Sequence, residues 1–225
     1  MARLLDLSHT VTAGMVTYKG LPGPVIADHL TREASRPLYA GGTTFQIGRI
    51  EMVANTGTYV DAPWHRWEDG ADLSQLSLAS LAGLDGVVIA APHARGLAVD
   101  EKFLDGKEVG GRAVLFFTGW ASRWGTPGYQ QRSPHLTSKA ASLLVSLGAA
   151  IVGIDSHNID DTDDKTRPVH SILLRAGIPI VEHLCNLEAL PPSGFRFFAV
   201  PVKVAGMGTF PVRAFAEIAE RAEAR

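Results

Sequence analysis

The chain has 225 residues, of which 46% are hydrophobic and 20% charged, and its formal net charge at pH 7 is −2. This composition is typical of a soluble globular protein, and we expect one domain over residues 1–225. The small net charge, without a stripe of Lys and Arg, argues against a nucleic-acid-binding surface. The single cysteine, Cys185, excludes an internal disulfide framework and a cysteine-cluster metal site.

The first nine residues contain one basic residue and no apolar stretch of signal-peptide length. No run approaches the ~20 apolar residues that a transmembrane helix needs. We therefore expect a cytoplasmic protein that binds neither membrane nor nucleic acid and whose partner is a small-molecule substrate.

Predicted strands and helices alternate along the chain. Strands are expected at residues 4–9, 43–53, 86–91, 113–120, 149–157, 178–183 and 195–205, and helices at residues 72–81, 134–147, 170–176 and 211–225. Residues 14–24 and 32–42 read as loops. Residues 160–165, which are rich in carboxylates, are expected to form a solvated loop unless something binds them. This alternation predicts an α/β fold with a partly parallel or mixed sheet.

Residues 55–66 read Asn-Thr-Gly-Thr-Tyr-Val-Asp-Ala-Pro-Trp-His-Arg and follow the predicted strand 43–53. Gly57 permits backbone conformations closed to other residues, and Pro63 fixes its own φ. Asp61 and His65 are therefore expected to be held across a rigid bend. A carboxylate beside an imidazole suits general acid–base catalysis or metal binding. The alternative is a polar turn in which Asp61 caps a backbone N–H and His65 is merely exposed.

Other acidic and imidazole groups follow further predicted strands. They are Asp155 with His157, Glu182 with His183, and His170 between these two pairs. Because ligands in α/β folds gather outside the carboxyl ends of strands, a pocket shared with Asp61 and His65 is expected. Glu182 interrupts an apolar run, where an unpaired carboxylate would be costly, although an edge-strand residue facing water is an alternative.

Residues 55–65 resemble the signature His-x-Gly-Thr-His-x-Asp-x-Pro-x-His of the cyclase family of metal-dependent hydrolases, which includes bacterial kynurenine formamidase and isatin hydrolase. The resemblance continues, in order, at residues 6–9, 153–156, 165–166, 170, 179–182, 186–187 and 201. It implies a swivelling β/β/α domain with a mixed sheet and flanking helices. It also implies a homodimer or homotetramer.

The resemblance further implies roles for individual residues. Asp61 matches the metal-binding aspartate of the family, and His65 matches the general base or acid beside the metal-bound water. His170 and Glu182 match two further ligands, so the implied metal set is Asp61, His170 and Glu182. The implied reaction is hydrolysis of a small amide, lactam or lactone by metal-activated water.

The chain departs from the family pattern at two positions, because Asn55 and Tyr59 replace metal-binding histidines. An amide and a neutral phenol are poor Zn²⁺ ligands. We therefore expect at most one divalent cation (Zn²⁺, Mn²⁺ or Mg²⁺), or none, with Tyr59 and Asn55 donating hydrogen bonds to a developing oxyanion. The catalytic candidates are His65, Asp61 and Tyr59, and the candidate substrate contacts are Asn55, Trp64, Tyr18 and His157.

Two further functions stay open at this point. One is a metal-independent cyclase, dehydratase or isomerase that uses His65 and Tyr59, because loss of a water-activating ion would harm hydrolysis more than a simple proton transfer. The other is a non-catalytic homologue that binds a small molecule.

Overall fold

The computed structural model describes residues 2–219. The strands are β1 (Ala2–Asp6), β2 (Val25–Leu30), β3 (Ile47–Glu51), β4 (Tyr59–Asp61), β5 (Ala82–Ala90), β6 (Ala98–Val99), β7 (Ala113–Phe117), β8 (His135–Leu136), β9 (Ile151–Ile154), β10 (Ile180–Glu182), β11 (Ser193–Phe198), β12 (Thr209–Pro211) and β13 (Phe215–Ala219). The α-helices are α1 (Arg32–Ser35), α2 (Ser138–Ser146) and α3 (Pro168–Arg175). Short 3₁₀ turns connect them, among them η1 (Arg36–Leu38), η2 (Pro63–His65) and η3 (Leu78–Ser80).

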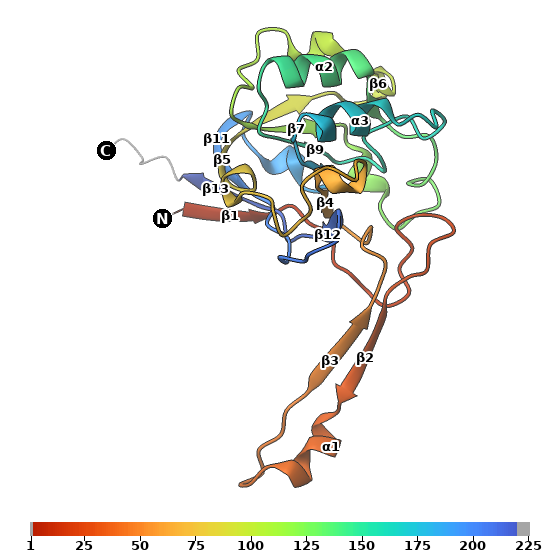
Figure 1. Ribbon diagram of the computed structural model, residues 1–225, viewed down its shortest axis with the longest axis vertical. Helices are drawn as coiled ribbons and strands as arrows, with labels where there is room; N and C mark the ends of the chain where they lie inside the picture. The colour runs from red at the N-terminus through yellow and green to blue at the C-terminus, as the bar shows by residue number, and fades with distance from the viewer. Residues whose placement is uncertain (1, 220–225) are drawn as a thin grey trace.

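Within residues 2–219, nine strands form one mixed sheet in the order β1-β13-β11-β5-β7-β9-β10-β4-β12 (Figure 1). The central run β5-β7-β9-β10 is parallel, and the strands on both sides of it are antiparallel. The expected α/β class with a mixed sheet is confirmed. The parallel strands need crossover connections, and two of these contain α2 and α3.

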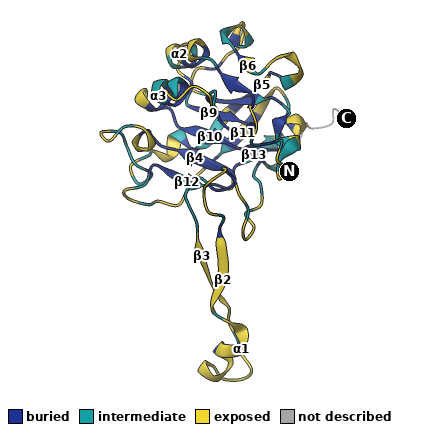
Figure 2. Cartoon of the chain, turned by 90° about the vertical axis from the view of Figure 1, so that its right-hand side faces the viewer, coloured by how far each residue is buried: buried dark blue, intermediate teal, exposed yellow. Residues whose placement is uncertain are grey.

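Helices α2 and α3 cover one face of the sheet (Figures 1 and 2). Because successive strand residues face opposite sides, β9 feeds both halves of the core. Val152 and Ile154 pack with Leu144 of α2 and Leu173 of α3, whereas Ile151 belongs to the apolar cluster that does not include the helices. The strands of the sheet centre are thus buried on both faces, as their continuous apolar runs predict.

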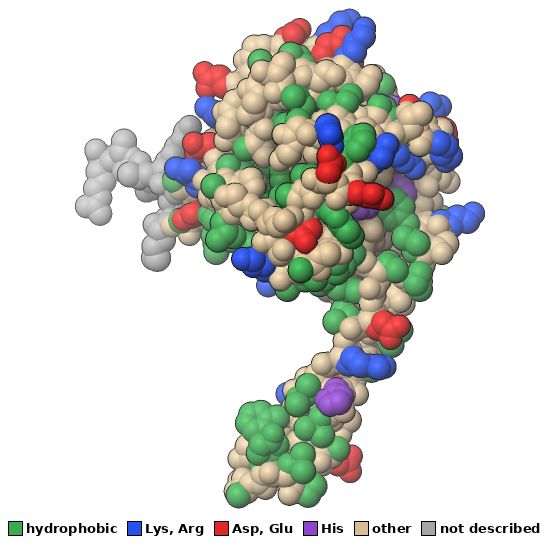
Figure 3. Space-filling model, viewed as in Figure 1, with side chains coloured by type: hydrophobic (Ala, Val, Ile, Leu, Met, Phe, Trp, Pro, Cys, Tyr) green, Lys and Arg blue, Asp and Glu red, His purple; other side chains and the backbone are tan. Residues whose placement is uncertain are grey.

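Strands β2 and β3 form an antiparallel arm that projects from the body and carries α1 and η1 at its tip (Figures 1 and 2). The expected strand at 43–53 exists in part as β3, but it lies in this arm and not in the main sheet. Large apolar side chains remain exposed along the arm: Val25, Ile26, Leu38, Tyr39, Phe45, Ile47 and Ile50. Figure 3 shows apolar atoms gathered at its tip.

Three sequence expectations are wrong. Residues 211–219 are not helical, because β13 pairs with both β1 and β11, and these ladders outweigh a weak helical pattern; residues 220–225 lie outside the described residues. The predicted helix at 72–81 is a series of turns ending in η3, and the loop at 32–42 contains α1 and η1.

Candidate active site

The site forms where β4 lies between β10 and β12. In the register of these strands, Asp61 is opposite both Ile180 and Thr209, and Tyr59 is opposite Glu182. Helix α3 brings His170 to the same place, and η2, which begins at Pro63, brings His65. Four predicted residues, Asp61, His65, His170 and Glu182, are thereby brought together.

A hydroxyl links the imidazole of His65 to the carboxylate of Asp61. Thr209 Oγ1 donates to Asp61 Oδ1 and lies 2.8 Å from His65 Nδ1. A hydroxyl has one proton, so when Thr209 donates to Asp61 it must accept from the Nδ1–H of His65. This tautomer leaves Nε2 of His65, whose side chain is 36% exposed, with a free lone pair.

His170 is held by a buried carboxylate behind it. Its Nδ1 lies 2.6 Å from Asp160 Oδ2, while Asp160 also accepts from the backbone N–H groups of Val169 and His170. Burial lowers the pKa of His170, but the bond to Asp160 and the charges of Asp61 and Glu182 outweigh it and raise the pKa to about 10. Asp160 thus fixes both the ring orientation and the outward-facing Nε2.

Both oxygens of the buried Glu182 carboxylate accept hydrogen bonds. Its Oε1 accepts from the N–H of Ile159 at 2.7 Å, and its Oε2 accepts from Tyr59 at 2.5 Å, with the Tyr18 hydroxyl oxygen 3.1 Å away. Burial raises the pKa of Glu182 against the opposing effect of His170. Burial and then Glu182 also raise the pKa of both phenols well above 10, so Tyr18 and Tyr59 stay protonated donors.

The donor atoms fit a single divalent cation. Asp61, His65 and His170 offer three ligand atoms that all lie within 4.8 Å of one another. Asp61 Oδ2 is buried and has no hydrogen-bond partner within residues 2–219, and it lies 3.6 Å from His170 Nε2. Glu182 Oε1 lies at the same distance from that nitrogen. Such separations suit ligand bonds of about 2.1 Å, and mixed carboxylate and imidazole donors suit Zn²⁺ or Mn²⁺.

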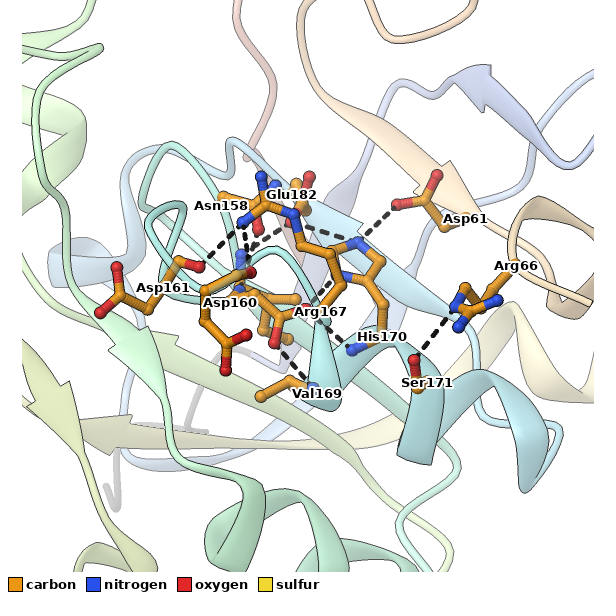
Figure 4. A network of polar contacts seen from close by, with 12 residues as sticks. Asp61, Arg66, Asn158, Asp160, Asp161, Arg167, Val169, His170, Ser171 and Glu182 are labelled. Carbon is orange, nitrogen blue, oxygen red and sulfur yellow. Dashed lines mark hydrogen bonds and ion pairs between the residues drawn. The ribbon is translucent and has the colours of Figure 1, made fainter.

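A cavity of about 270 Å³ opens beside these groups. Figure 4 shows Asp61, His170 and Glu182 at this place. Its lining residues are Tyr18, Leu21, Asn55, Tyr59, His65, Arg66, Asn158, Arg167, His170 and Glu182. The predicted contacts Tyr18 and Asn55 are among them. The volume is at the lower end of the range for ligand pockets and indicates a small substrate.

Two expected substrate contacts lie elsewhere. Trp64 is 41% exposed and lines a separate recess with Glu68 and Asp72, because successive side chains of a 3₁₀ turn point about 120° apart. The imidazole of His157 packs on Tyr129 and the ring of Tyr18, and only its carbonyl oxygen reaches the site, where it accepts from the Tyr18 hydroxyl.

Two other residues expected in the shared pocket, His183 and Asp155, do not line it. His183 lies behind the site, where its Nδ1 is 2.7 Å from the hydroxyl of Tyr129. Asp155 accepts from the N–H groups of Thr118 and Gly119 in a different recess of about 480 Å³. The expectation that all these strand-end residues share one pocket is therefore wrong for His183 and Asp155, whose side chains lie away from the cavity.

Sequence reasoning missed Thr209, Asp160 and two cavity arginines, Arg66 and Arg167. Asp160 falls in the predicted solvated loop 160–165 and lies seven residues before the N-cap Arg167, so the usual capping position gives no signal for it. Thr209 has no signal either, because only the pairing of β12 with β4 places it against Asp61.

The fold and the site define an α/β enzyme with a carboxylate–imidazole centre under a small cavity. A family model described as "Putative cyclase" matches residues 5–161. A kynurenine formamidase of Geobacillus thermodenitrificans is 31% identical over 170 residues, which are 75% of this chain and 78% of that protein. A kynurenine formamidase of Sphingopyxis alaskensis is 28% identical over 227 residues, 95% of this chain and 97% of that protein.

The structure of isatin hydrolase A from Labrenzia aggregata has the same fold. It superimposes with a TM-score of 0.82 at 24% sequence identity, over 97% of this chain and 94% of that one. The chain belongs to the cyclase family, and it is an enzyme of the hydrolase class.

Proposed function

We propose that the protein hydrolyses the C–N bond of a small amide or lactam, or the C–O bond of a lactone. The observation that carries this proposal is the chain His65–Thr209–Asp61, which leaves Nε2 of His65 free to act as a base beside a small cavity. The relatives named as a formamidase and an isatin hydrolase support the same bond class.

In the proposed reaction, His65 Nε2 takes a proton from water as the water oxygen adds to the substrate carbonyl carbon. The resulting oxyanion accepts a hydrogen bond from the side-chain amide of Asn55, which lines the cavity. His65 then returns the proton to the leaving nitrogen as the C–N bond breaks, so that acid and amine are released. Asp61 acts through Thr209 to hold the tautomer of His65.

We assign Tyr59 a positioning role and not the expected role of hydrogen-bond donor to the oxyanion. Its single proton is engaged by Glu182, with Tyr18 beside it at 2.9 Å, so we assign it to positioning Glu182. A divalent cation held by Asp61, His170 and Glu182 would polarise the carbonyl and lower the pKa of a water molecule. His65, the third member of the close group with Asp61 and His170, would then stay unbound and act as the base.

The test is a panel of N-formyl amines, lactams and lactones offered to wild type and His65→Ala. We expect turnover with wild type and a loss of about 10²–10⁴-fold in kcat for the variant, with retained melting temperature. No turnover of any compound by wild type, or full activity of His65→Ala, would refute the proposal.

We further propose a homodimer of a cytoplasmic protein. The exposed apolar side chains of the β2–β3 arm support the dimer, since an arm of this kind has no core of its own. A groove of about 600 Å³ at the body offers an apolar counterpart through Val16, Leu21 and Trp124, so each copy carries both halves of a two-fold interface. Within residues 2–219, no helix has the length and apolar character to cross a membrane.

A further inference from the structure

Two guanidinium groups, those of Arg66 and Arg167, line the cavity, and the hydrolytic steps give neither of them a role. Arg66 directly follows η2 and Arg167 directly precedes α3, so two segments distant in sequence bring positive charge to one place. In the part of the chain that the structure describes, neither guanidinium has a carboxylate within ion-pair distance. An anionic ligand would supply the missing partner.

Arg167 is half-buried and held in place by one of its nitrogens. Its Nη1 donates to the carbonyl oxygen of Asp161 at 2.8 Å and to that of Asp164 at 3.5 Å. Its backbone φ of 48° is in the left-handed region, which is uncommon for a residue with a Cβ and is often found at functional sites. The adjacent Nε–H and Nη2–H have no protein acceptor in the described residues, and two adjacent donors form the fork that a carboxylate accepts.

Arg66 is fixed through a different nitrogen. Its Nε donates to Ser171 Oγ at 3.1 Å, and its guanidinium lies over the ring of Trp67 at 4.4 Å. This leaves the edge formed by Nη1 and Nη2 for a ligand. Figure 4 shows Arg167 alongside His170, with Arg66 and Ser171 on the other side of that imidazole. The two arginines therefore flank the reacting centre.

We propose that the substrate carries a carboxylate in addition to the amide or lactam bond. Arg167 binds this carboxylate through Nε and Nη2, and Arg66 adds positive charge from the other side of the cavity. The inference rests on the proposed hydrolysis, whose substrate it narrows to an anionic acyl-amino compound. A planar carboxylate matches the forked donors of Arg, and a monoanion suits a site whose floor holds Asp61 and Glu182. A phosphate dianion fits less well, because those two carboxylates would repel its second charge.

If Arg167 had a purely structural role, its replacement would have a different effect on ligand binding. The bonds from its Nη1 tie down the 160–167 loop, which includes Asp160, the group that orients His170. If that were its only role, the loss of Arg167 would affect charged and neutral ligands equally. Selective loss of the charged ligand separates the two roles.

The direct test measures binding by calorimetry with benzoate and benzamide, which have nearly the same shape but differ in charge. We expect wild type to prefer benzoate by about 10- to 100-fold, and Arg167→Gln to lose most of this preference with benzamide binding unchanged. Arg66→Gln should lose part of it. The control is Arg132→Gln, which removes a cation that pairs with Asp161 and Asp163 on the same loop but does not line the cavity.

Three results would each overturn the proposal. They are equal binding of the two probes by wild type, no binding of either probe at about 10 mM, and an unchanged preference in Arg167→Gln. A second readout uses turnover of N-formylphenylalanine and its carboxamide. Arg167→Gln should raise KM for the acid alone, at nearly constant kcat. If wild type cleaves neither compound but still prefers benzoate, the hydrolytic function fails while the anion site stands.

Discussion

The single proton of the Thr209 hydroxyl decides which nitrogen of His65 is free. If Thr209 is replaced by Val, His65 loses the acceptor for its Nδ1–H and the link to Asp61, so more of the imidazole adopts the wrong tautomer. We expect kcat of Thr209→Val to fall at least about tenfold with KM little changed, measured by steady-state kinetics. Thr209→Ser keeps the hydroxyl and should retain most activity. Equal loss in both variants would contradict this relay.

Asp61 Oδ2, which has no hydrogen-bond partner among the described residues, predicts metal binding at this site. Protein purified without a metal-affinity tag should bind about one divalent ion per chain after dialysis against Mn²⁺ or Zn²⁺, as measured by plasma emission spectrometry. Asp61→Asn replaces one ligand oxygen with an amide, and we expect the affinity to fall at least about tenfold. Asp69→Asn, an exposed carboxylate change, is the control. Wild type that stays empty at saturating metal would exclude this site.

At the scale of single residues, the sequence predicted the centre of the site but not its supports. Asp61 and His65 were predictable because Pro63 and a four-residue spacing limit where their side chains can go. Glu182 was predictable because a carboxylate in an apolar run must find partners. Thr209 and Arg66 could not be assigned, because their roles depend on which strands and turns become neighbours.

At the scale of elements, α3 depends on a carboxylate outside it. Asp160 accepts the N–H groups of Val169 and His170 at the start of the helix and also holds the ring of His170. Asp160→Asn removes a buried charge that accepts three hydrogen bonds. We expect it to lower the free energy of unfolding by about 1–3 kcal/mol, measured by urea denaturation, and to reduce activity as His170 loses its orientation.

The matched control for Asp160 is Asp163→Asn on the same loop. Asp163 is exposed, and in the described part of the chain its side chain makes one surface contact, with Arg132 at 3.7 Å. Its loss should therefore change stability by less than about 0.5 kcal/mol. If the two variants had the same stability and activity, the assigned role of Asp160 would be wrong.

The elements that the sequence predicted best are those whose pattern agrees with their tertiary environment. Strands β7 and β9 are buried on both faces and have continuous apolar runs, and α2 has a regular apolar face and ends before Gly148. The failed prediction at β13 has the opposite cause, since residues 215–219 are strand only because β1 and β11 flank them. The local sequence pattern of β13 cannot show that it will pair with β1, which is about two hundred residues earlier in the chain.

At the scale of the whole molecule, buried imidazoles link stability to pH. Burial lowers the pKa of His9 to about 4, and burial together with Arg167 lowers that of His157 to about 4. Both histidines titrate near 6.5 in the unfolded chain, which therefore binds more protons than the folded chain between pH 6.5 and 4. Their contribution to stability is complete above pH 6.5 and is lost as the pH falls towards 4.

Urea denaturation at pH 7, 6, 5 and 4 measures this loss. We expect the free energy of unfolding to fall by up to about 1.4 kcal/mol per pH unit for each histidine over that range. His157→Phe, which keeps an aromatic ring in the cluster, should flatten the slope, whereas His29→Gln on the exposed arm should not. A slope that is unchanged in His157→Phe would contradict the assignment.

The β2–β3 arm tests the proposed dimer at the scale of the whole molecule. A two-stranded ribbon with exposed Phe45, Ile47 and Ile50 is poorly stable alone and prone to nonspecific association unless another surface covers it. We expect wild type to be dimeric by light scattering at micromolar concentration. Replacement of residues 25–51 by a short Gly/Ser linker should give a monomer with an intact body. The body should fold without the arm because β2 and β3 lie outside the main sheet. A short linker can close the gap because Val25 pairs with Glu51 at the base of the arm.

Phe45→Asp combined with Ile50→Asp tests the same point without shortening the chain. Two charges on the apolar surface of the arm should weaken the dimer by at least about tenfold in Kd, because each would have to be desolvated at the interface. The matched control, His29→Gln, changes an exposed polar residue of the same arm and should leave the dimer intact. A wild-type monomer, or an armless chain that still dimerises, would show that the arm serves another purpose, and the groove at Val16, Leu21 and Trp124 would then need a different occupant.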